Sequence, residues 1–197
     1  MKIDFEKGAG LVPAIVQNAD TLQVLMLGYM NADAFAKTQE TGLVTFYSRS
    51  RKTLWTKGET SGNSLALVDM TVDCDKDTVL VKARPVGPTC HTGTVSCFGE
   101  EGADGVGFLA YLETLIEGRK TSDPESSYTA QLLQGPLRRA AQKVGEEGVE
   151  TALAAVAETE GKLVSEAADL FYHTLVLLAA KDVNLEAVIA ELQGRHS

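Results

Sequence analysis

Alternating apolar and polar positions run through most of the first hundred residues, and they predict short β-strands. Three pairs of such segments are each joined by a short polar turn, at residues 11–17 and 22–30, 43–48 and 53–58, and 64–72 and 78–86. A period of two residues places alternate side chains on one face of a sheet, and polar turns between such segments are typical of hairpins. Asn31 is a suitable cap for one short helix, from residue 32 to about 41, which Gly42 ends.

After residue 107 the pattern becomes helical, because apolar side chains recur at every third or fourth position. The predicted helices are residues 108–120, about 127–133, 137–158, 162–181 and 185–193. Residues 99–107 are rich in glycine and acidic residues, a composition typical of a linker. The sequence therefore predicts an α+β chain with a small β-rich N-terminal domain, residues 1–104, and an all-α helical-bundle domain, residues 105–197.

Charge and composition narrow the classes of partner. The 197 residues carry a formal net charge of −9, and no polybasic run is present, which argues against nucleic acid or an anionic membrane as a partner. No apolar run approaches the roughly 18 residues of a membrane span, and the N-terminus has no apolar signal core. We therefore expect a cytoplasmic protein. Its three cysteines argue against a disulfide framework and favour metal binding or catalysis.

The first candidate site combines cysteines and a histidine. Cys90 and Cys97 lie in an irregular segment with His91, and Cys74 lies upstream. Three thiolates suit a zinc ion that keeps one position for water, whose pKa zinc would lower toward neutrality. The alternative is three free or buried cysteines that serve only packing.

Aspartates at alternate positions surround Cys74. In a strand, Asp73, Asp75 and Asp77 would share one face and Cys74 would lie on the other, an arrangement that suits a hard cation on the oxygen side. Lys76 is the only counterion nearby in the sequence. The alternative is a solvated aspartate-rich turn.

A polar, glycine-containing segment between two predicted strands could let backbone amides approach a phosphate, or it could be an ordinary loop. Together with its neighbours it forms the motifs SRSRKTLWTKGETSGN, DCDKDT and GPTCHTGTVSCF. In this order the motifs resemble phosphoribosyl-AMP cyclohydrolases, over about residues 10–100. The substrate contacts that we predict in this region are Arg49, Trp55, Lys57, Gly58, Glu59, Thr60, Ser61, Gly62 and Asn63.

The cyclohydrolase resemblance implies hydrolysis of the N1–C6 bond of the adenine ring in phosphoribosyl-AMP. It implies zinc at Cys74, Cys90 and Cys97, with the ligands shared across a homodimer, and His91 as the general base. It further implies Mg²⁺ at the aspartates, namely Asp73, Asp75 and Asp77.

Acidic residues on two consecutive predicted helices form a second candidate site. Their positions follow the i,i+3 and i,i+4 spacing of one helical edge, at Glu146, Glu147 and Glu150, and then at Glu166 and Asp169. No Lys or Arg occurs from residue 144 to 161, so we expect the first group to lack local salt-bridge partners. Mg²⁺ coordination would explain the cluster, and two solvated helix faces are the alternative.

Two basic or titratable residues accompany these acids. Lys143 is predicted either to contact phosphate oxygens or to be a surface lysine, and His173 to pack near the acids rather than bind metal. The pattern EExxE followed by ExxD resembles the all-α nucleotide pyrophosphatases. With SSYTAQLL and KVGEEGVE, it is similar to phosphoribosyl-ATP pyrophosphatase over about residues 108–197.

The second resemblance implies cleavage of the α–β phosphoanhydride with release of pyrophosphate. It implies a catalytic role for Glu147 and Mg²⁺ held on the triphosphate by Glu146, Glu147, Glu150, Glu166 and Asp169. The two resemblances concern consecutive reactions and indicate a bifunctional hydrolase of histidine biosynthesis. Two alternatives stay open: a zinc-containing interaction protein, and a single-activity nucleotide pyrophosphatase with a degenerate N-terminal domain.

Overall fold

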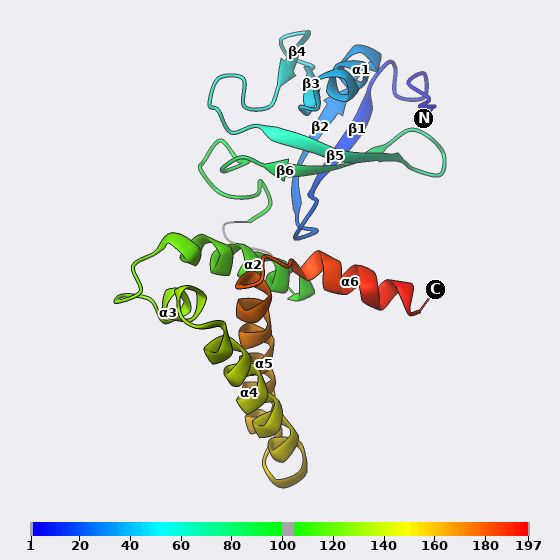
Figure 1. Cartoon of the computed structure of the whole chain (residues 1–197). Coiled ribbons are helices and arrows are strands. Elements are labelled where there is room, and N and C mark those ends of the chain that lie inside the picture. The colour runs from blue at the N-terminus through cyan, green and yellow to red at the C-terminus, as the bar shows by residue number, and fades with distance from the viewer. Residues whose placement is uncertain (1, 100–104, 197) are drawn as a thin grey trace. The chain divides into compact units, whose positions relative to one another are not determined.

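A computed structural model describes residues 2–99 and 105–196 (Figure 1). The chain divides into two compact units, Met1–Phe108 and Leu109–Ser197. Of the predicted linker, residues 100–104 lie outside the described residues, and Gly105–Gly107 form a short 3₁₀ turn. The predicted domain boundary after residue 104 falls at the edge of the undescribed segment and stays a prediction.

The N-terminal unit contains a four-stranded sheet, a separate two-stranded hairpin and one helix. Its elements are β1 (Val12–Asn18), β2 (Val24–Met30), α1 (Ala32–Thr41), β3 (Thr45–Ser48), β4 (Thr53–Thr56), β5 (Leu65–Val72) and β6 (Val79–Pro85). The order in the larger sheet is β2-β1-β6-β5, with β1 and β6 parallel and the other neighbours antiparallel. The three predicted hairpins, β1–β2, β3–β4 and β5–β6, are confirmed. The parallel pairing of β1 with β6 joins the first hairpin to the last in one sheet.

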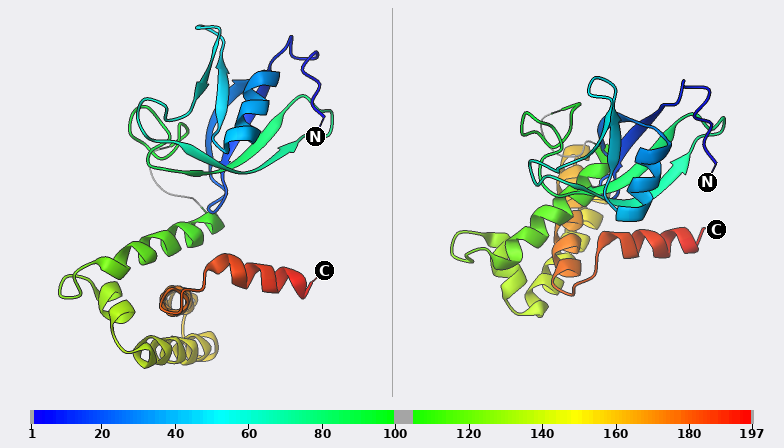
Figure 2. Two further views of the ribbon diagram at one scale, coloured as in Figure 1. Left: turned by 45° about the horizontal axis from the view of Figure 1, so that its top comes forward. Right: turned by 90° about the horizontal axis from the view of Figure 1, so that it is seen from above.

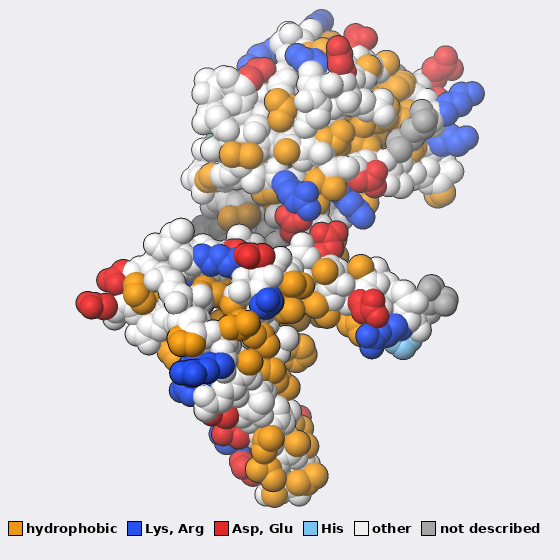
Figure 3. Space-filling view, viewed as in Figure 1, with side chains coloured by type: hydrophobic (Ala, Val, Ile, Leu, Met, Phe, Trp, Pro, Cys, Tyr) orange, Lys and Arg blue, Asp and Glu red, His pale blue; other side chains and the backbone are white. Residues whose placement is uncertain are grey.

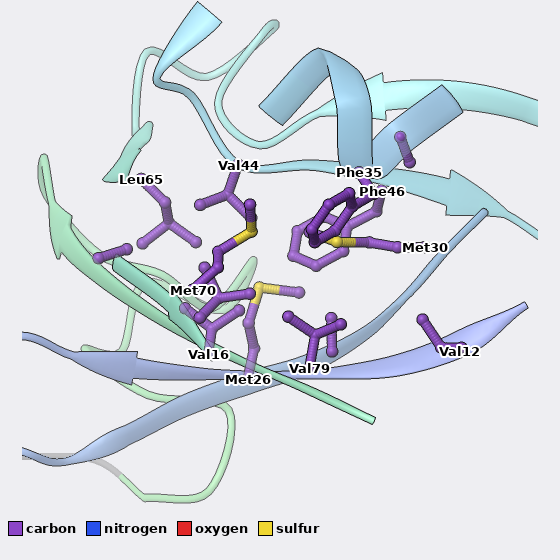
Figure 4. Close-up of a cluster of buried hydrophobic side chains, with 14 of the residues drawn as sticks. Val12, Val16, Met26, Met30, Phe35, Val44, Phe46, Leu65, Met70 and Val79 are labelled. Atoms are coloured by element: carbon purple, nitrogen blue, oxygen red, sulfur yellow. The ribbon is translucent and has the colours of Figure 1, made fainter. Parts of the chain in front are cut away.

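Alternation along the strands builds the core of this unit. In β1 the side chains of Val12, Ala14 and Val16 are fully buried, while the intervening residues are only partly so. Figure 4 shows how apolar side chains from the sheet, from α1 and from β3 converge, including those of Phe35 and Phe46. The predicted helix signals also hold, because the Asn31 side chain accepts from the amide of Ala34 at 2.8 Å and Gly42 ends the helix at a φ of 69°.

The C-terminal unit is helical, as predicted. Its helices are α2 (Phe108–Gly118), α3 (Tyr128–Gln134), α4 (Leu137–Ala157), α5 (Glu160–Ala179) and α6 (Leu185–Gly194), with a 3₁₀ turn at Arg119–Thr121. The two long helices α4 and α5 pack against each other, as Figures 1 and 2 show. Thr159 accepts from the amide of Lys162 at 3.3 Å and so begins α5 after a tight connection. None of the described helices has the length and apolar character needed to cross a membrane.

Candidate active sites

The aspartates lie in a hairpin turn rather than in a strand. Because β5 ends at Val72 and β6 begins at Val79, the strand-face arrangement predicted for them is wrong. Instead, one carboxylate oxygen of Asp73 accepts from the amides of Asp77 and Thr78, each at 3.0 Å. This turn brings carboxylate oxygens of all three aspartates within 4.8 Å of one another.

Hydrogen bonds favour the ionised form of the first aspartate. Desolvation opposes ionisation of Asp73, but the amide of Thr78 and other donors outweigh it, so the pKa of Asp73 lies below its usual value. The turn is therefore an anionic cluster whose remaining oxygens are available to a cation.

The counterion of this cluster comes from the N-terminal end of the chain. Lys7 Nζ donates to the carbonyl of Asp75 at 2.6 Å and to its Oδ2 at 3.2 Å, and it lies 3.8 Å from Asp77 Oδ2. The hydrogen bond to Asp75 raises the pKa of Lys7. Sequence reasoning missed Lys7 and expected Lys76 instead, because Lys7 and Asp75 are 68 positions apart and lie close together only through the parallel pairing of β1 with β6.

The cysteine loop is fixed to the edge of β2. The amide of Cys97 donates to the carbonyl of Leu25 at 2.8 Å, and Ser96 Oγ donates to the carbonyl of Val24 at 2.7 Å. Within the loop, the predicted base His91 is exposed, and its Nδ1 lies 3.8 Å from Cys90 Sγ. The loop therefore places the imidazole and a thiol side by side.

The two thiols of this loop differ in acidity. Thr92 Oγ1 donates to Cys90 Sγ at 3.0 Å, and this bond is the main reason that the pKa of Cys90 falls to about 6. Burial, and then the neighbouring Cys90, raise the pKa of Cys97. At neutral pH the loop therefore presents one thiolate, the form in which cysteine binds metal.

The third cysteine does not join these two within one chain. Among the described residues, the groups of three or more potential ligands that converge within 4.8 Å contain no cysteine. Cys74 lies exposed in the aspartate turn, and all three thiols are free. A single copy of the chain therefore does not assemble the predicted three-thiolate site.

The predicted substrate segment forms a tight turn next to the cysteine loop. Trp55 packs on Phe46 with ring centroids 5.0 Å apart, and Lys57 Nζ donates to the carbonyl of Asn63 at 3.1 Å. Gly58 has a φ of 85°, and a Cβ there would lie 2.5 Å from the backbone of Asn63, so the turn requires glycine. The charge of Lys57 acts on the thiol of Cys97, which connects the two loops electrostatically.

The remaining predicted contacts lie on the surface. The outer edge of the same turn is exposed at Glu59, Thr60, Ser61 and Gly62. Arg49 lies apart from this turn, in the β3–β4 connection, with its guanidinium carbon 3.9 Å from the ring centroid of Tyr29.

In the C-terminal unit, three of the five predicted acids come together. Carboxylate oxygens of Glu147 and Glu150 on α4 and of Glu166 on α5 lie within 4.8 Å of one another. Glu147 and Glu166 are only 5% and 4% exposed. Glu146 lies outside this group and accepts a hydrogen bond from Lys143, and Asp169 also lies outside it, with an exposed side chain.

Lysines neutralise this cluster, so the expectation that it lacks local partners is wrong. Lys143 Nζ lies 2.6 Å from Glu147 Oε1 and 3.0 Å from Glu146 Oε2, and Lys162 pairs with Glu166. Both lysines lie just outside the stretch that is free of basic residues, one helical turn from their partners. The hydrogen bond to Glu147 raises the pKa of Lys143, and the bond from Lys162 lowers the pKa of Glu166.

Glu150 forms no such bond to a lysine of the described ranges. Its pKa is raised by burial and then by the charges of Glu147 and Glu166. Repulsion among these carboxylates would be relieved by a divalent cation, and an all-oxygen donor set of this kind suits Mg²⁺.

His173 lies buried beside this cluster. Its Nε2 is 3.7 Å from Glu147 Oε1, and its ring contacts those of Tyr128 and Tyr172 edge-on. Burial lowers the pKa of His173, and its Nδ1 has no hydrogen-bond partner among the described residues. The neutral ring therefore packs against the acidic site.

The fold and these sites define a two-domain protein with a cluster of converging carboxylates in each domain and a cysteine loop in the first. The family profile for phosphoribosyl-AMP cyclohydrolase matches residues 26–99, and the profile for phosphoribosyl-ATP pyrophosphohydrolase matches residues 109–196. Proteins described as histidine biosynthesis bifunctional protein HisIE are similar over both domains.

These relatives cover nearly the whole chain. The Vibrio vulnificus protein is 56% identical over 198 residues, covering 99% of this chain and 93% of its own length. The Salmonella typhimurium protein is 57% identical and the Escherichia coli K12 protein 55%, each covering 99% of this chain and 96% of its own length. The chain therefore belongs to the bifunctional phosphoribosyl-AMP cyclohydrolase and phosphoribosyl-ATP pyrophosphohydrolase family, and it is a bifunctional enzyme of histidine biosynthesis. The two alternatives left open by the sequence are not supported.

Proposed function

We propose that the two units catalyse consecutive steps in the reverse of their order along the chain. The C-terminal unit cleaves phosphoribosyl-ATP to phosphoribosyl-AMP and pyrophosphate, and the N-terminal unit then hydrolyses the N1–C6 bond of the adenine ring. One observation carries this assignment: each family match falls within one compact unit, and each unit has an acidic cluster of its own. A cytoplasmic location stays a prediction.

In the C-terminal unit, Glu147, Glu150 and Glu166 fit Mg²⁺ because their oxygens converge and lysine ammonium groups already contact two of them. Bound Mg²⁺ would neutralise charge on the triphosphate. Lys143 would move from Glu147 to a phosphate oxygen, and Glu147 would then accept a proton from the attacking water. We retain Glu146 and Asp169 as proposed members of the site.

In the N-terminal unit, the thiols fit zinc only if a second copy contributes. Cys90 and Cys97 come from one loop, and Cys74 of a second copy would supply the third sulfur, so we propose a homodimer. Bound zinc would activate a water for attack on C6 of the ring. His91, whose Nδ1 lies 3.8 Å from Cys90 Sγ, would take the proton from that water.

Two further features support this arrangement. The aspartate turn, Asp73 to Asp77, offers oxygen donors that suit Mg²⁺. The C-terminal unit also exposes large apolar side chains near the α4–α5 connection, among them Leu153, Val156 and Val164, and such surfaces are common where copies associate (Figure 3).

The test is one incubation of the full-length protein with phosphoribosyl-ATP, Mg²⁺ and Zn²⁺, in which pyrophosphate release and the ultraviolet change of ring opening are followed together. We expect pyrophosphate to appear first. Glu147→Gln should lower pyrophosphate release by roughly 100-fold or more and leave ring opening of added phosphoribosyl-AMP unchanged. Glu186→Gln, an exposed acid on α6, is the control. If Glu147→Gln lost both activities while Glu186→Gln kept both, the assignment of one reaction to each unit would be contradicted.

A further inference from the structure

A cavity of about 510 Å³ in the N-terminal unit belongs to neither acidic cluster. Its lining includes Gly10, Asn31, Tyr47, Arg49 and Lys52. This volume lies within the range of about 300–1,000 Å³ that is common for small-molecule sites. Two cations, a phenol, an amide and an accessible glycine backbone are groups that suit an anionic ligand.

The hairpin turn between β3 and β4 brings the two cations to this cavity. The amide of Lys52 donates to the carbonyl of Ser48 at 2.8 Å, and Lys52 takes a left-handed φ of 55°. This closes the turn, so that its first and last residues, Arg49 and Lys52, line the same cavity. Arg51, at the tip of the turn, is not part of the lining.

Within the described part of the chain, no acidic side chain pairs with either cation. The guanidinium of Arg49 stacks on Tyr29, which orients it and leaves its charge in place. Neither Arg49 nor Lys52 forms an ion pair with any residue of the described ranges, whereas Arg84, for example, pairs with Asp20 at 2.9 Å. In a chain with a net charge of −9, two unneutralised cations at one cavity create a local positive potential that attracts anions.

We propose that this cavity binds a phosphate monoester of the ring-opening substrate, an inference that rests on the function proposed for the N-terminal unit. Phosphoribosyl-AMP carries one phosphate monoester on each of its two riboses, so its site must accommodate two phosphates. Arg49 can contact phosphate oxygens in a bidentate manner, and Lys52 adds a point charge. Gly10, with a φ of 90° and open space where a Cβ would be, lets the backbone approach closely.

The experiment compares Lys52→Met with Arg51→Met in the full-length protein loaded with Zn²⁺ and Mg²⁺. Both changes remove one positive charge from the same exposed turn, but only Lys52 lines the cavity. We expect Lys52→Met to raise the KM for phosphoribosyl-AMP about 10-fold with kcat changed less than about two-fold. Arg51→Met should leave both constants within about two-fold of wild type, and Lys52→Arg should recover most of the loss.

Competition experiments identify the ligand. Ring opening should be inhibited by ribose 5-phosphate but not by ribose. The inhibition by ribose 5-phosphate should be weaker in Lys52→Met than in wild type, and unchanged in Arg51→Met. Equal KM values in Lys52→Met and Arg51→Met, or a loss confined to kcat, would overturn it. The proposal would also be overturned if Lys52→Met changed neither the inhibition by inorganic phosphate nor the KM for phosphoribosyl-AMP. Pyrophosphate release from phosphoribosyl-ATP measures the active protein in every sample.

A direct binding experiment tests the phosphate site even if the N-terminal unit does not catalyse ring opening. If the wild-type protein opens no ring, ribose 5-phosphate is titrated directly by calorimetry. The phosphate site would still be supported if wild type and Arg51→Met bind ribose 5-phosphate and Lys52→Met binds it about 10-fold more weakly. Absence of binding, or equal binding by all three proteins, would overturn it.

Discussion

Lysine ammonium groups contact both acidic clusters. Lys7 bonds to Asp75, Lys143 to Glu147, and Lys162 to Glu166. An ammonium group carries the same sign of charge as a metal ion and stabilises the same carboxylates, so it competes with that ion for them. At each cluster, a bound metal ion would therefore compete with a lysine for the carboxylates.

We expect Lys162→Met to tighten metal binding at the C-terminal cluster. Lys162 is half exposed, so its pairing with the buried Glu166 is partly screened, and its removal should lower the dissociation constant roughly two- to five-fold. Titration with Mn²⁺, followed by electron paramagnetic resonance, measures this without turnover. Lys181→Met, an exposed lysine at the end of the same helical pair, is the control. Unchanged or weaker binding in Lys162→Met would show that the lysine does not compete.

The lowered pKa of Cys90 predicts a pH dependence in metal-free protein. Only the thiolate reacts with iodoacetamide, so alkylation of Cys90 should be half-maximal near pH 6 and should level off by neutral pH. An ordinary thiol, with a pKa of about 8.5, would still gain reactivity above pH 8. Peptide mass spectrometry resolves Cys90 from Cys97, whose raised pKa predicts slower reaction.

The hydroxyl of Thr92 provides the control for this dependence. Because its hydrogen bond is the main cause of the lowered pKa, Thr92→Val should move the midpoint for Cys90 to higher pH. A midpoint near 8.5 in the wild-type protein, or one that Thr92→Val leaves in place, would contradict this account.

At the scale of elements, one glycine decides how the β3–β4 hairpin packs on the larger sheet. Gly28 lies in β2, and a Cβ at this position would lie 2.3 Å from Cδ1 of Phe46, whose side chain is fully buried. The missing side chain lets the ring pack against the strand, and Trp55 covers the ring from β4. The segment that carries Arg49 therefore depends on this close contact.

We expect Gly28→Ala to destabilise the N-terminal unit by about 1–3 kcal/mol, because the methyl group overpacks a closed core. Urea unfolding followed by the fluorescence of Trp55, the single tryptophan, reports this unit selectively. Gly161→Ala, at an open position in the first turn of α5, is the matched control and should leave this transition unchanged. A wild-type midpoint in Gly28→Ala would show that the ring can move aside at little cost.

The sequence predicts the local elements well, because each depends on neighbouring residues. The Asn31 cap, the Gly42 end and the three hairpins all follow from spacing within about 20 residues. The sequence does not reveal contacts that depend on strand order. The pairing of Lys7 with Asp75 follows from the parallel alignment of β1 and β6, which no local pattern specifies.

The same limit applies to the sites. The helical spacing of Glu147 and Glu150 was readable from the sequence, and so was the nearby Glu166, because α4 and α5 are consecutive and antiparallel neighbours. Which acids converge was not readable, since it depends on how each helix is rotated about its axis. For that reason Glu146 and Asp169 lie outside the group that the sequence assigned to one site.

At the scale of the whole molecule, the positions of the thiols motivate the homodimer that we propose. Cys90 and Cys97 share a loop, but among the described residues of a single copy the three thiols do not converge within 4.8 Å. If zinc takes all three sulfurs, a symmetric pair of chains forms two sites, each with Cys74 from one copy and the other two cysteines from the other.

This arrangement predicts complementation between inactive variants. Cys74→Ser and Cys90→Ser should each lose ring opening alone. In a mixed dimer, however, the intact Cys74 of one chain meets the intact Cys90 and Cys97 of the other, which restores one of two sites. Random pairing makes half of the dimers mixed, so co-expression should recover about a quarter of wild-type ring opening. Pyrophosphate release by the C-terminal unit should stay normal and serves as the measure of total enzyme.

The pair Cys90→Ser and Cys97→Ser provides the control, because both cysteines of a site come from the same copy and every mixed site still lacks one sulfur. We expect no recovery from this pair. Differently tagged chains, purified through both tags, isolate the mixed dimers and should raise recovery for Cys74→Ser with Cys90→Ser to about half. Inactive mixed dimers from that pair would exclude sulfur sharing between copies, and recovery in the control pair would place Cys90 and Cys97 in different sites.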